Sequence, residues 1–516
     1  MDLTAFAGQL VMAGFQGTAL PSDFARQVEE DGLSGIILFS RNLSGPAQIR
    51  RLTDQLQALT PDGLPMLIAT DQEGGIVARL SGIAGTDFPG NMALGAAHSP
   101  ELAHAAALAA GRELLALGIN MNLAPVLDVN NNPQNPVIGV RSYGEDPHLV
   151  AELGAAAIRG YQEAGVLACG KHFPGHGDTA VDSHLALPTV AHDRVRLDEV
   201  ELVPFRAAVA AGVGAIMTAH VVFPAYEPDP ARPATLSRPV LTGLLRDRLT
   251  FDGLVITDCM EMKAIANGFG TVAAVVEAVK AGADLVLVSH TAQTQRAAVA
   301  ALKAAIASGE IPAERVEQAL GRIRRARERA AGVQQPSLAL LAAPDHTALA
   351  DRIAAAAVTV VKDEPKLLPL PATGLGVVVC RAAAQSLAEE QSIPEPAFAA
   401  AVRKLLPGAE LLVADRAPTP GQIAAAGALA ARSHAVVVAT FGAAQWPAQA
   451  ELVAAVLAAN PRTAVVAQRS PYDLRVLPPA VGTYLAIYED RPRVAEAAVR
   501  ILLGQHVASG RLPVTV

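Results

Sequence analysis

Short apolar runs recur through the first 290 residues of the chain, and alanine-rich segments with helical spacing lie between them. Apolar residues that repeat every three or four positions indicate helices, whereas a short continuous apolar run indicates a strand buried on both faces. The segments with helical spacing include residues 101–117, 149–163, 199–211 and 271–281. The eight predicted strands are residues 10–15, 35–40, 66–71, 119–126, 166–173, 214–219, 253–258 and 284–289.

The alternation of eight strands with helices predicts an α/β fold, namely a closed (β/α)8 barrel of the TIM type. A doubly wound open sheet fits the alternation too, but it rarely needs eight such units. Two more helices are predicted at residues 293–308 and 313–331, where the barrel domain (1–331) ends.

A second, smaller domain is predicted after the barrel, as expected for a chain of 516 residues. The barrel pattern breaks at residues 332–350, a stretch with Gln, Pro and Ser that we interpret as a linker. A new α/β series follows, and it is too short for another barrel. We therefore predict an α/β sandwich over residues 351–516, with strands at 358–361, 376–380, 411–414, 435–440, 463–467 and 483–487.

Composition and charge narrow the possible partners. The net charge of −8 gives no indication of nucleic acid or an anionic membrane as a partner. The three cysteines are far apart in sequence, which argues against a disulfide framework or a zinc site and favours buried thiols in a reducing compartment. The first basic residue is Arg26, so the start lacks the positive charge of a signal peptide. We expect a cytoplasmic protein without a membrane partner; its oligomeric state is open.

Polar residues stand at the carboxyl ends of the predicted strands, which is where barrel active sites form. The strands were chosen for their apolar runs alone, so this clustering is partly independent support for a barrel enzyme. These strand-end residues are Asp71, Asn122, Asp128, Lys171, His172, Thr218, His220 and Asp258.

The segment KHFPGHGDTAVDSHLALP, residues 171–188, is the richest in titratable groups. Asp182 and His184 lie two positions apart, so in an extended backbone they project to the same side. The carboxylate could then orient the imidazole, and such a histidine can act as general acid and then general base. A surface loop with helix-capping aspartates is the structural alternative. The chemical alternative is a metal site. However, His172 and His176 stand on either side of a Phe-Pro-Gly turn and not on one face of a helix.

Three more segments carry candidate chemistry. Asp258 ends the apolar strand in GLVITDCMEM, where it could face a substrate as a nucleophile or else cap the next helix. Asp71 in DQEGG, with Arg79 close behind, suits paired sugar hydroxyls, because ionised groups make the stronger hydrogen bonds. Arg141 in VIGVRSYGED could hold a hydroxyl or acyl oxygen. Taken alone, the last two segments could equally serve turns.

Together these segments resemble family-3 glycoside hydrolases, specifically the β-N-acetylhexosaminidase branch. The matching pieces stand in family order over most of residues 1–300, and GKHFPGHG…DSH is the most specific. SPYDLRVLP and ASGRLPVTV resemble the family's C-terminal sandwich. The resemblance implies a carbohydrate substrate, a retaining double displacement, and neither metal nor cofactor. It makes Asp258 the nucleophile and His184, paired with Asp182, the acid/base. The implied sugar-binding residues are Asp71, Arg79, Arg141, Lys171 and His172.

The chain departs from the family pattern DQEGGRV at Ile76, where the family has arginine, so contacts near that position are in question. Trp446, the single tryptophan, could line a site for the leaving group or pack between the domains. The expected activity is exo-β-N-acetylglucosaminidase on muropeptides or chitin-derived sugars. The alternatives are a phosphorylase or β-glucosidase of the same family, a metal-dependent hydrolase, and a non-catalytic sugar-binding protein.

Overall fold

The computed structural model describes residues 2–60, 63–386, 388–389 and 395–516. Eight parallel strands close into a barrel in the order β1-β10-β9-β8-β7-β6-β3-β2, which confirms the predicted TIM-type fold. Each predicted apolar run contains or overlaps one strand. The barrel strands are β1 (Val11–Ala13), β2 (Gly35–Leu38), β3 (Leu67–Thr70), β6 (Met121–Asn122), β7 (Leu167–Phe173), β8 (Ala215–Thr218), β9 (Leu254–Cys259) and β10 (Leu285–Val288).

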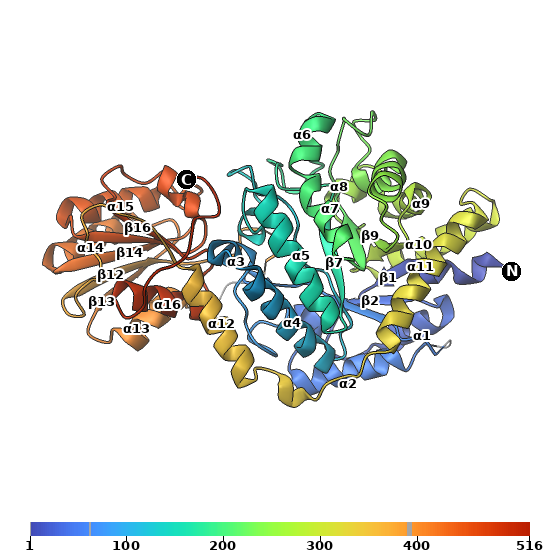
Figure 1. Ribbon diagram of the computed structural model, residues 1–516, viewed down its shortest axis with the longest axis horizontal. Coiled ribbons are helices and arrows are strands. Elements are labelled where there is room, and N and C mark those ends of the chain that lie inside the picture. The colour runs from blue at the N-terminus through green and yellow to red at the C-terminus, as the bar shows by residue number, and fades with distance from the viewer. Residues whose placement is uncertain (1, 61–62, 387, 390–394) are drawn as a thin grey trace.

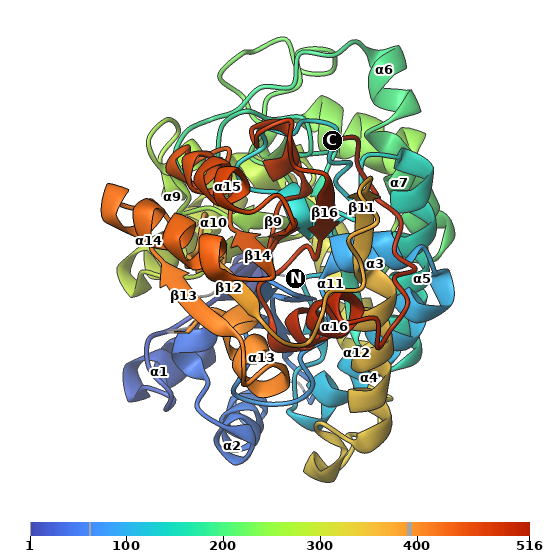
Figure 2. The same cartoon turned by 90° about the vertical axis from the view of Figure 1, so that its left-hand side faces the viewer.

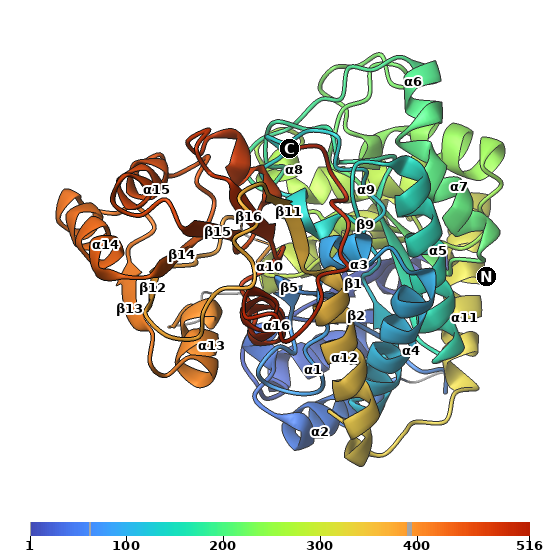
Figure 3. The same ribbon diagram turned by 60° about the vertical axis from the view of Figure 1, so that its left-hand side comes forward.

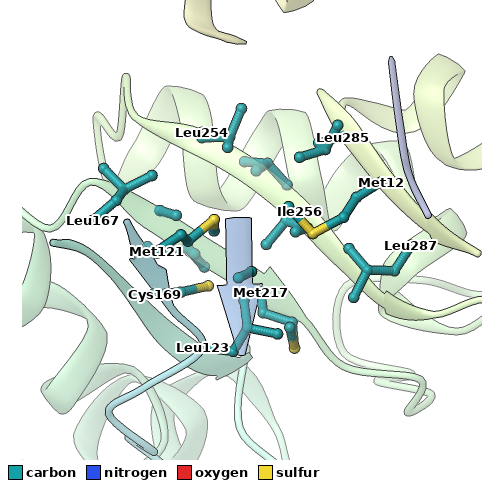
Figure 4. Close-up of a cluster of buried hydrophobic side chains, with 14 of the residues drawn as sticks. Met12, Met121, Leu123, Leu167, Cys169, Met217, Leu254, Ile256, Leu285 and Leu287 are labelled. Carbon is teal, nitrogen blue, oxygen red and sulfur yellow. The ribbon is translucent and has the colours of Figure 1, made fainter. Parts of the chain in front are cut away.

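Apolar side chains from the strands fill the barrel interior (Figure 4). Met12, Met121, Met217 and Ile256 lie together there and are almost completely buried. Gly35 leaves room for this packing, because a Cβ at that position would stand 2.7 Å from the terminal methyl of Met12. The filled interior leaves the carboxyl ends of the strands as the place for a binding cavity.

Helices surround the barrel (Figure 1) and explain the alanine-rich composition. Helix α5 packs closely against α4: a Cβ at Gly160 would stand 2.4 Å from the backbone oxygen of His104. Small side chains permit such close approach. None of the described helices combines the length and apolarity that a membrane crossing requires. The main helices of the barrel are α1 (Ser22–Asp31), α2 (Pro46–Gln57), α4 (Pro100–Ala116), α5 (Pro147–Glu163), α7 (Leu202–Ala210), the π-helix Pro239–Arg248, α9 (Thr271–Ala281), α10 (Ala292–Ala307) and α11 (Ala313–Ala331).

The C-terminal part forms a separate six-stranded sheet in the order β11-β16-β15-β14-β12-β13, seen in front of the barrel in Figure 2. Five strands are parallel, and β11 pairs antiparallel with β16. Helices α13 and α16 cover one face, and α14 and α15 cover the other. The strands are β11 (Thr359–Asp363), β12 (Leu375–Cys380), β13 (Glu410–Ala414), β14 (Ala435–Thr440), β15 (Thr463–Ala467) and β16 (Thr483–Ala486). The helices are α13 (Ala397–Leu405), α14 (Pro420–Arg432), α15 (Ala448–Ala459) and α16 (Pro492–Leu502).

Helix α12 (Pro344–Ala357) connects the two parts and begins inside the stretch 332–350 that the sequence pattern indicates as a linker. We keep the domain limits 1–331 and 351–516, predicted from the sequence, as a proposal. The C-terminal stretch then returns to the barrel along the boundary between the two parts (Figure 3). There the N–H of Arg511 donates to the carbonyl of Ala96 at 2.8 Å, and the N–H of Glu145 donates to that of Pro513 at 3.1 Å.

Ile76, where the sequence departs from the family pattern, lies at this boundary. Its side chain packs against a buried apolar cluster that includes Met92 of the barrel and Tyr488 and Val514 of the C-terminal part. An isoleucine here contributes to the contact between the two parts, and an arginine at the same place would bring a charge to an apolar surface.

Glu489 at the same boundary should make stability depend on pH. Its side chain is 3% exposed, and its Oε2 accepts the N–H of Gly90 at 2.8 Å. Burial raises the pKa of Glu489 to about 7, against the lowering influence of the Gly90 N–H and Arg491. In the unfolded chain the carboxyl ionises above pH 4.5. The stability contributed by the protonated form is therefore complete below pH 4.5 and lost as pH rises through 7.

Glu489→Gln should therefore raise the free energy of unfolding at pH 8 by on the order of 2–3 kcal/mol, and by less than about 1 kcal/mol at pH 5. Denaturant unfolding at the two pH values measures the difference. Glu364→Gln is the matched control, because that carboxylate is exposed. Equal effects of Glu489→Gln at both pH values would show that the buried carboxyl does not titrate in this range.

Candidate active site

A cavity of about 470 Å³ opens at the carboxyl ends of the barrel strands. Its size is within the usual range for small-molecule sites. The strand ends bring together segments that are far apart in the chain. Seven of the eight predicted site residues line the cavity: Asp71, Arg79, Arg141, Lys171, His172, His184 and Asp258. The eighth, Asp182, is hydrogen-bonded to His184.

A buried network of charges forms one side of the cavity. Lys171 is 2% exposed, and its Nζ lies 2.9 Å from Asp71 Oδ1 and 2.7 Å from Glu73 Oε1. Arg141 donates two hydrogen bonds to Glu73, of 2.9 and 2.8 Å. Burial opposes every one of these charges, but Arg141 and Lys171 hold the pKa of Glu73 well below its usual range. The network is therefore ionised, and groups of this kind make the stronger hydrogen bonds to a polar ligand.

Glu73 belongs to this network, yet sequence reasoning did not single it out. It stands two residues after Asp71 in DQEGG, on the short strand β4 (Gln72–Gly74), which pairs with β5 (Val77–Ala78). The available signal was a second carboxylate next to the strand-end Asp71. Its partner, Arg141, lies 68 residues away in the chain, and no local pattern indicates such a pairing.

Arg79 connects the cavity to the C-terminal part. Its Nη2 lies 3.4 Å from Asp71 Oδ2, and its Nη1 donates to the carbonyl oxygen of Ala388 at 3.0 Å. Ala388 also lines the cavity. Arg41, which sequence reasoning missed, lies over the ring of Phe39 at 4.2 Å and donates to the carbonyl oxygens of Phe15 and Ser289. Both arginines contribute to the rim of the cavity.

Asp128 fixes the orientation of His172. The carboxylate is fully buried; its Oδ2 lies 2.7 Å from Nδ1 of His172, and its Oδ1 accepts the N–H groups of His172 and His176. Burial alone would raise the pKa of Asp128, but His172 and His176 together hold it below its ordinary value. An ionised Asp128 accepts the proton on Nδ1, so Nε2 of His172 is the nitrogen available to the cavity.

His176 anchors the turn that carries the Asp182–His184 pair. Its ring lies between Thr179 Oγ1 at 2.8 Å and Ser183 Oγ at 2.9 Å. Burial lowers the pKa of His176 to about 4, so the ring is neutral at pH 7. The carbonyl of Ser183 in turn accepts the N–H of Ala264 at 3.3 Å. His176 is thus a positioning residue for the loop, although it also lines the cavity.

Asp182 and His184 interact, but not through the extended backbone that their spacing suggested. The segment is a turn, in which the N–H of Leu185 donates to the carbonyl of Asp182 at 2.9 Å. Asp182 Oδ1 therefore reaches both the backbone N–H of His184 at 2.8 Å and its Nδ1 at 2.7 Å. The side chain of Asp182 is 8% exposed and that of His184 is 23% exposed. The carboxylate is thus covered, and Nε2 of His184 is accessible from the cavity.

Asp258 lies at the end of strand β9 and lines the same cavity as the charged network. Its Oδ1 accepts the N–H of Cys259 at 2.7 Å. Burial alone would raise the pKa of Asp258, but the imidazoles of His220, His172 and His184 together with the N–H of Cys259 hold it below its ordinary value, so the carboxylate is ionised at neutral pH. In the described part of the chain, no cationic side chain is bound to this carboxylate. Its electron pairs are therefore available to a substrate.

The structure also bears on the metal site and on Trp446, whose roles the sequence left open. Within the described ranges, no three His, Cys, Asp or Glu side chains stand together as a possible metal site, although residues 171–188 contain three histidines. Trp446 belongs to the C-terminal part, where Arg416 lies over its ring at 4.8 Å. Cys169, Cys259 and Cys380 are buried and unpaired.

A polar cavity at the carboxyl ends of a (β/α)8 barrel, walled by an ionised carboxylate and a carboxylate-bound imidazole, defines a barrel enzyme. The chain belongs to glycosyl hydrolase family 3, because residues 4–326 match the model of the N-terminal domain of that family.

Individual relatives agree with this membership. A glycoside hydrolase family 3 β-N-acetylglucosaminidase from Paenibacillus sp. str. FPU-7 superposes with a TM-score of 0.93 at 44% identity, covering 100% of this chain and 99% of that one. Beta-hexosaminidase A of Pseudoalteromonas piscicida is 39% identical over 381 residues, which are 68% of this chain and 63% of the relative. The chain thus spans less than two thirds of that relative's length. A beta-hexosaminidase of Thiobacillus denitrificans is 39% identical over 54% of this chain and 78% of its own length.

Proposed function

We propose that the protein is a retaining exo-β-N-acetylglucosaminidase, which removes terminal β-linked N-acetylglucosamine from glycosides. The observation that carries the proposal is the presence of the Asp258 carboxylate and the His184 imidazole on the walls of one cavity. The printed names of the relatives, β-hexosaminidase and β-N-acetylglucosaminidase, support the choice of sugar.

The chemistry takes two displacements. In the first, the Asp258 carboxylate attacks the anomeric carbon while the bond to the leaving oxygen breaks, and Nε2 of His184 donates its proton to that oxygen. In the second, Nε2 takes a proton from water, the water oxygen attacks the anomeric carbon, and the bond to Asp258 breaks. Two inversions give net retention. Asp182 holds Nδ1 throughout, which keeps Nε2 directed at the substrate.

The charged network supplies the contacts to the sugar. Asp71 accepts hydrogen bonds from hydroxyl groups, Lys171 and Arg79 donate to them, and Arg141 is held in place by Glu73. His172, oriented by Asp128, offers Nε2. Because ion pairs already fix these groups, they lose little conformational entropy when a sugar binds.

The physiological role follows from the same proposal. Muropeptides and chitin-derived sugars both carry terminal β-linked N-acetylglucosamine, and with muropeptides the role is cell-wall recycling. Three unpaired, buried thiols suit a reducing compartment. We therefore place the enzyme in the cytoplasm.

Hydrolysis of p-nitrophenyl β-N-acetylglucosaminide and of the matching β-glucoside tests the proposal. We expect a preference of at least tenfold for the acetamido sugar, turnover unaffected by chelator, and free sugar as the product in phosphate buffer. Equal rates with both sugars would contradict the assignment. Sugar 1-phosphate as the product would indicate a phosphorylase, and loss of activity with chelator that zinc restores would indicate a metal-dependent hydrolase. Binding without product would indicate a sugar-binding protein.

A further inference from the structure

The C-terminal sheet has a topological switch point. Its parallel strands run in the order β13-β12-β14-β15-β16, so β12, the first of them in the chain, lies inside the sheet. Leaving β12, the chain passes through α13 to β13 on one side; it then passes through α14 to β14 on the other side. Helices α13 and α14 cover opposite faces. In open α/β sheets, ligands bind in the crevice at the carboxyl ends of the two strands where the order reverses.

A cavity of about 310 Å³ lies at this edge of the sheet. Gln385 follows β12, Gly442 and Gln445 follow β14, and Ser470 follows β15; all four line the cavity. The opposite wall is the barrel loop formed by residues 133–140. The switch-point crevice is thus enclosed between the two parts of the molecule and has no role in the proposed hydrolysis.

The charged side chains of the crevice already have hydrogen-bond or ion-pair partners within the protein. Arg469 is paired with Glu389 through both guanidinium Nη atoms, one of them at 2.9 Å. Asp473 uses both oxygens: Oδ2 accepts the hydroxyl of Thr440 at 2.7 Å, and Oδ1 accepts the N–H of Ala443 at 2.8 Å. No carboxylate or guanidinium of the described lining is left to select a charged ligand. The crevice therefore suits an uncharged one.

Polar groups with unused hydrogen bonds stand beside apolar surface. Nε2 of Gln385 is buried and has no partner among the residues that the structure describes, and the same holds for Oγ of the neighbouring Ser386. Pro133, Ile138 and Tyr472 add apolar surface to the lining. Buried donors are normally satisfied, so an unsatisfied one in a cavity indicates a missing acceptor. A neutral saccharide has apolar faces with hydroxyl or amide groups around its edge, and such a ligand matches this lining.

We propose that the crevice at the carboxyl ends of β12 and β14 is a second binding site, which takes a neutral saccharide between the C-terminal sheet and the barrel loop 133–140. The loop connects this site to the cavity of the barrel. Ile138 lines both cavities, and its carbonyl accepts the N–H of Arg141 at 2.8 Å. Asn135 donates to the carbonyls of His176 and Gly177 at 2.8 and 2.9 Å. A saccharide that contacts the loop would thus act on Arg141 and on the turn that carries His184.

Trp446 provides the readout, since it is the single tryptophan and follows Gln445 of the crevice directly. Titration of the wild-type protein with N-acetylglucosamine or glucose, neither of which carries a glycosidic bond to be cleaved, should change its emission saturably, whereas inorganic phosphate should not. Ala444→Phe should weaken this response at least tenfold, because Ala444 is exposed and lines the crevice. Gln385→Leu, which removes the unpaired amide, should do the same. Ala425→Phe on the exposed surface of α14 is the control.

An emission that no neutral saccharide changes, or a response that Ala444→Phe leaves intact, would overturn the proposal. A response to phosphate alone would overturn the class of ligand. The titration does not depend on the reaction catalysed by the barrel, so its outcome stands even where the hydrolysis assay fails.

The same variant separates two sources of the saccharide. A crevice that holds the distal units of the glycan being cleaved predicts that Ala444→Phe lowers kcat/KM about tenfold for chitotetraose and not for chitobiose. A crevice that holds a separate sugar predicts unchanged kcat/KM for both, together with the lost emission response. Equal losses for both substrates would mean that the substitution damages the barrel cavity, which would overturn the assignment of a distinct site.

Discussion

Asp258→Asn and Asp258→Ala should lower kcat for p-nitrophenyl β-N-acetylglucosaminide on the order of 10⁵-fold, as removal of a nucleophile does in other enzymes that form covalent intermediates. The carboxylate is ionised because three imidazoles and the N–H of Cys259 together outweigh its burial and hold its pKa below the ordinary value of 3.8. Neither amide nor methyl can form the glycosyl-enzyme. Release of p-nitrophenol measures the loss directly.

Folding and chemistry can be separated for this residue. Asp258 accepts a backbone N–H from Cys259, and an asparagine oxygen can accept the same bond, so Asp258→Asn should unfold at a temperature close to that of the wild type. Azide added to Asp258→Ala should restore turnover and give the glycosyl azide of inverted configuration, because the small anion takes the place of the carboxylate. Asp252→Asn, at an exposed carboxylate that pairs with Arg322 and Arg325, is the activity control. A variant of Asp258 with wild-type turnover would remove this residue as the nucleophile.

The strands of the fold were predictable because they are buried on both faces. A parallel barrel strand contacts side chains of the interior and of the surrounding helices, so nearly every position is apolar and the run stands out in the sequence. The hairpin of β4 and β5 left no such pattern, because it has only three and two residues and lies over the cavity. Helix α12 was not predicted, because its first residues, Pro344 and Asp345, resemble a linker as much as a first helical turn.

The site was predictable in part for a reason of topology. Parallel strands in a barrel end on the same side, so residues such as Asp71, Lys171 and Asp258 converge whatever lies between them in sequence. The partners of these residues did not follow from the pattern. The side chains that Glu73 and Asp128 contact stand 44 to 98 positions away in the sequence. Only the closed barrel brings them together. The turn at Asp182 depends on local hydrogen bonds to Leu185 and His184 that spacing alone does not specify.

His184→Ala should affect substrates according to how much help their leaving group needs. For chitobiose, whose leaving oxygen must be protonated, kcat/KM should fall by about 10³–10⁴. For 2,4-dinitrophenyl β-N-acetylglucosaminide, which leaves as a stable anion, kcat/KM should stay within about tenfold of the wild type. The kcat/KM of Asp182→Asn for chitobiose should lie between those of the wild type and His184→Ala. The imidazole remains in this variant, but the carboxylate that holds its Nδ1 at 2.7 Å is gone.

The second step offers an independent measurement on the same variant. Without His184 no group draws the proton from water, so the glycosyl-enzyme should accumulate with the dinitrophenyl substrate and appear as a burst of dinitrophenol. Azide needs no deprotonation and should relieve the block with retained configuration. His192→Ala is the matched control, because His192 pairs with Asp178 on the same loop but is not part of the cavity wall that the structure describes. Equal losses for chitobiose and the dinitrophenyl substrate would show that His184 holds the substrate or the loop and transfers no proton.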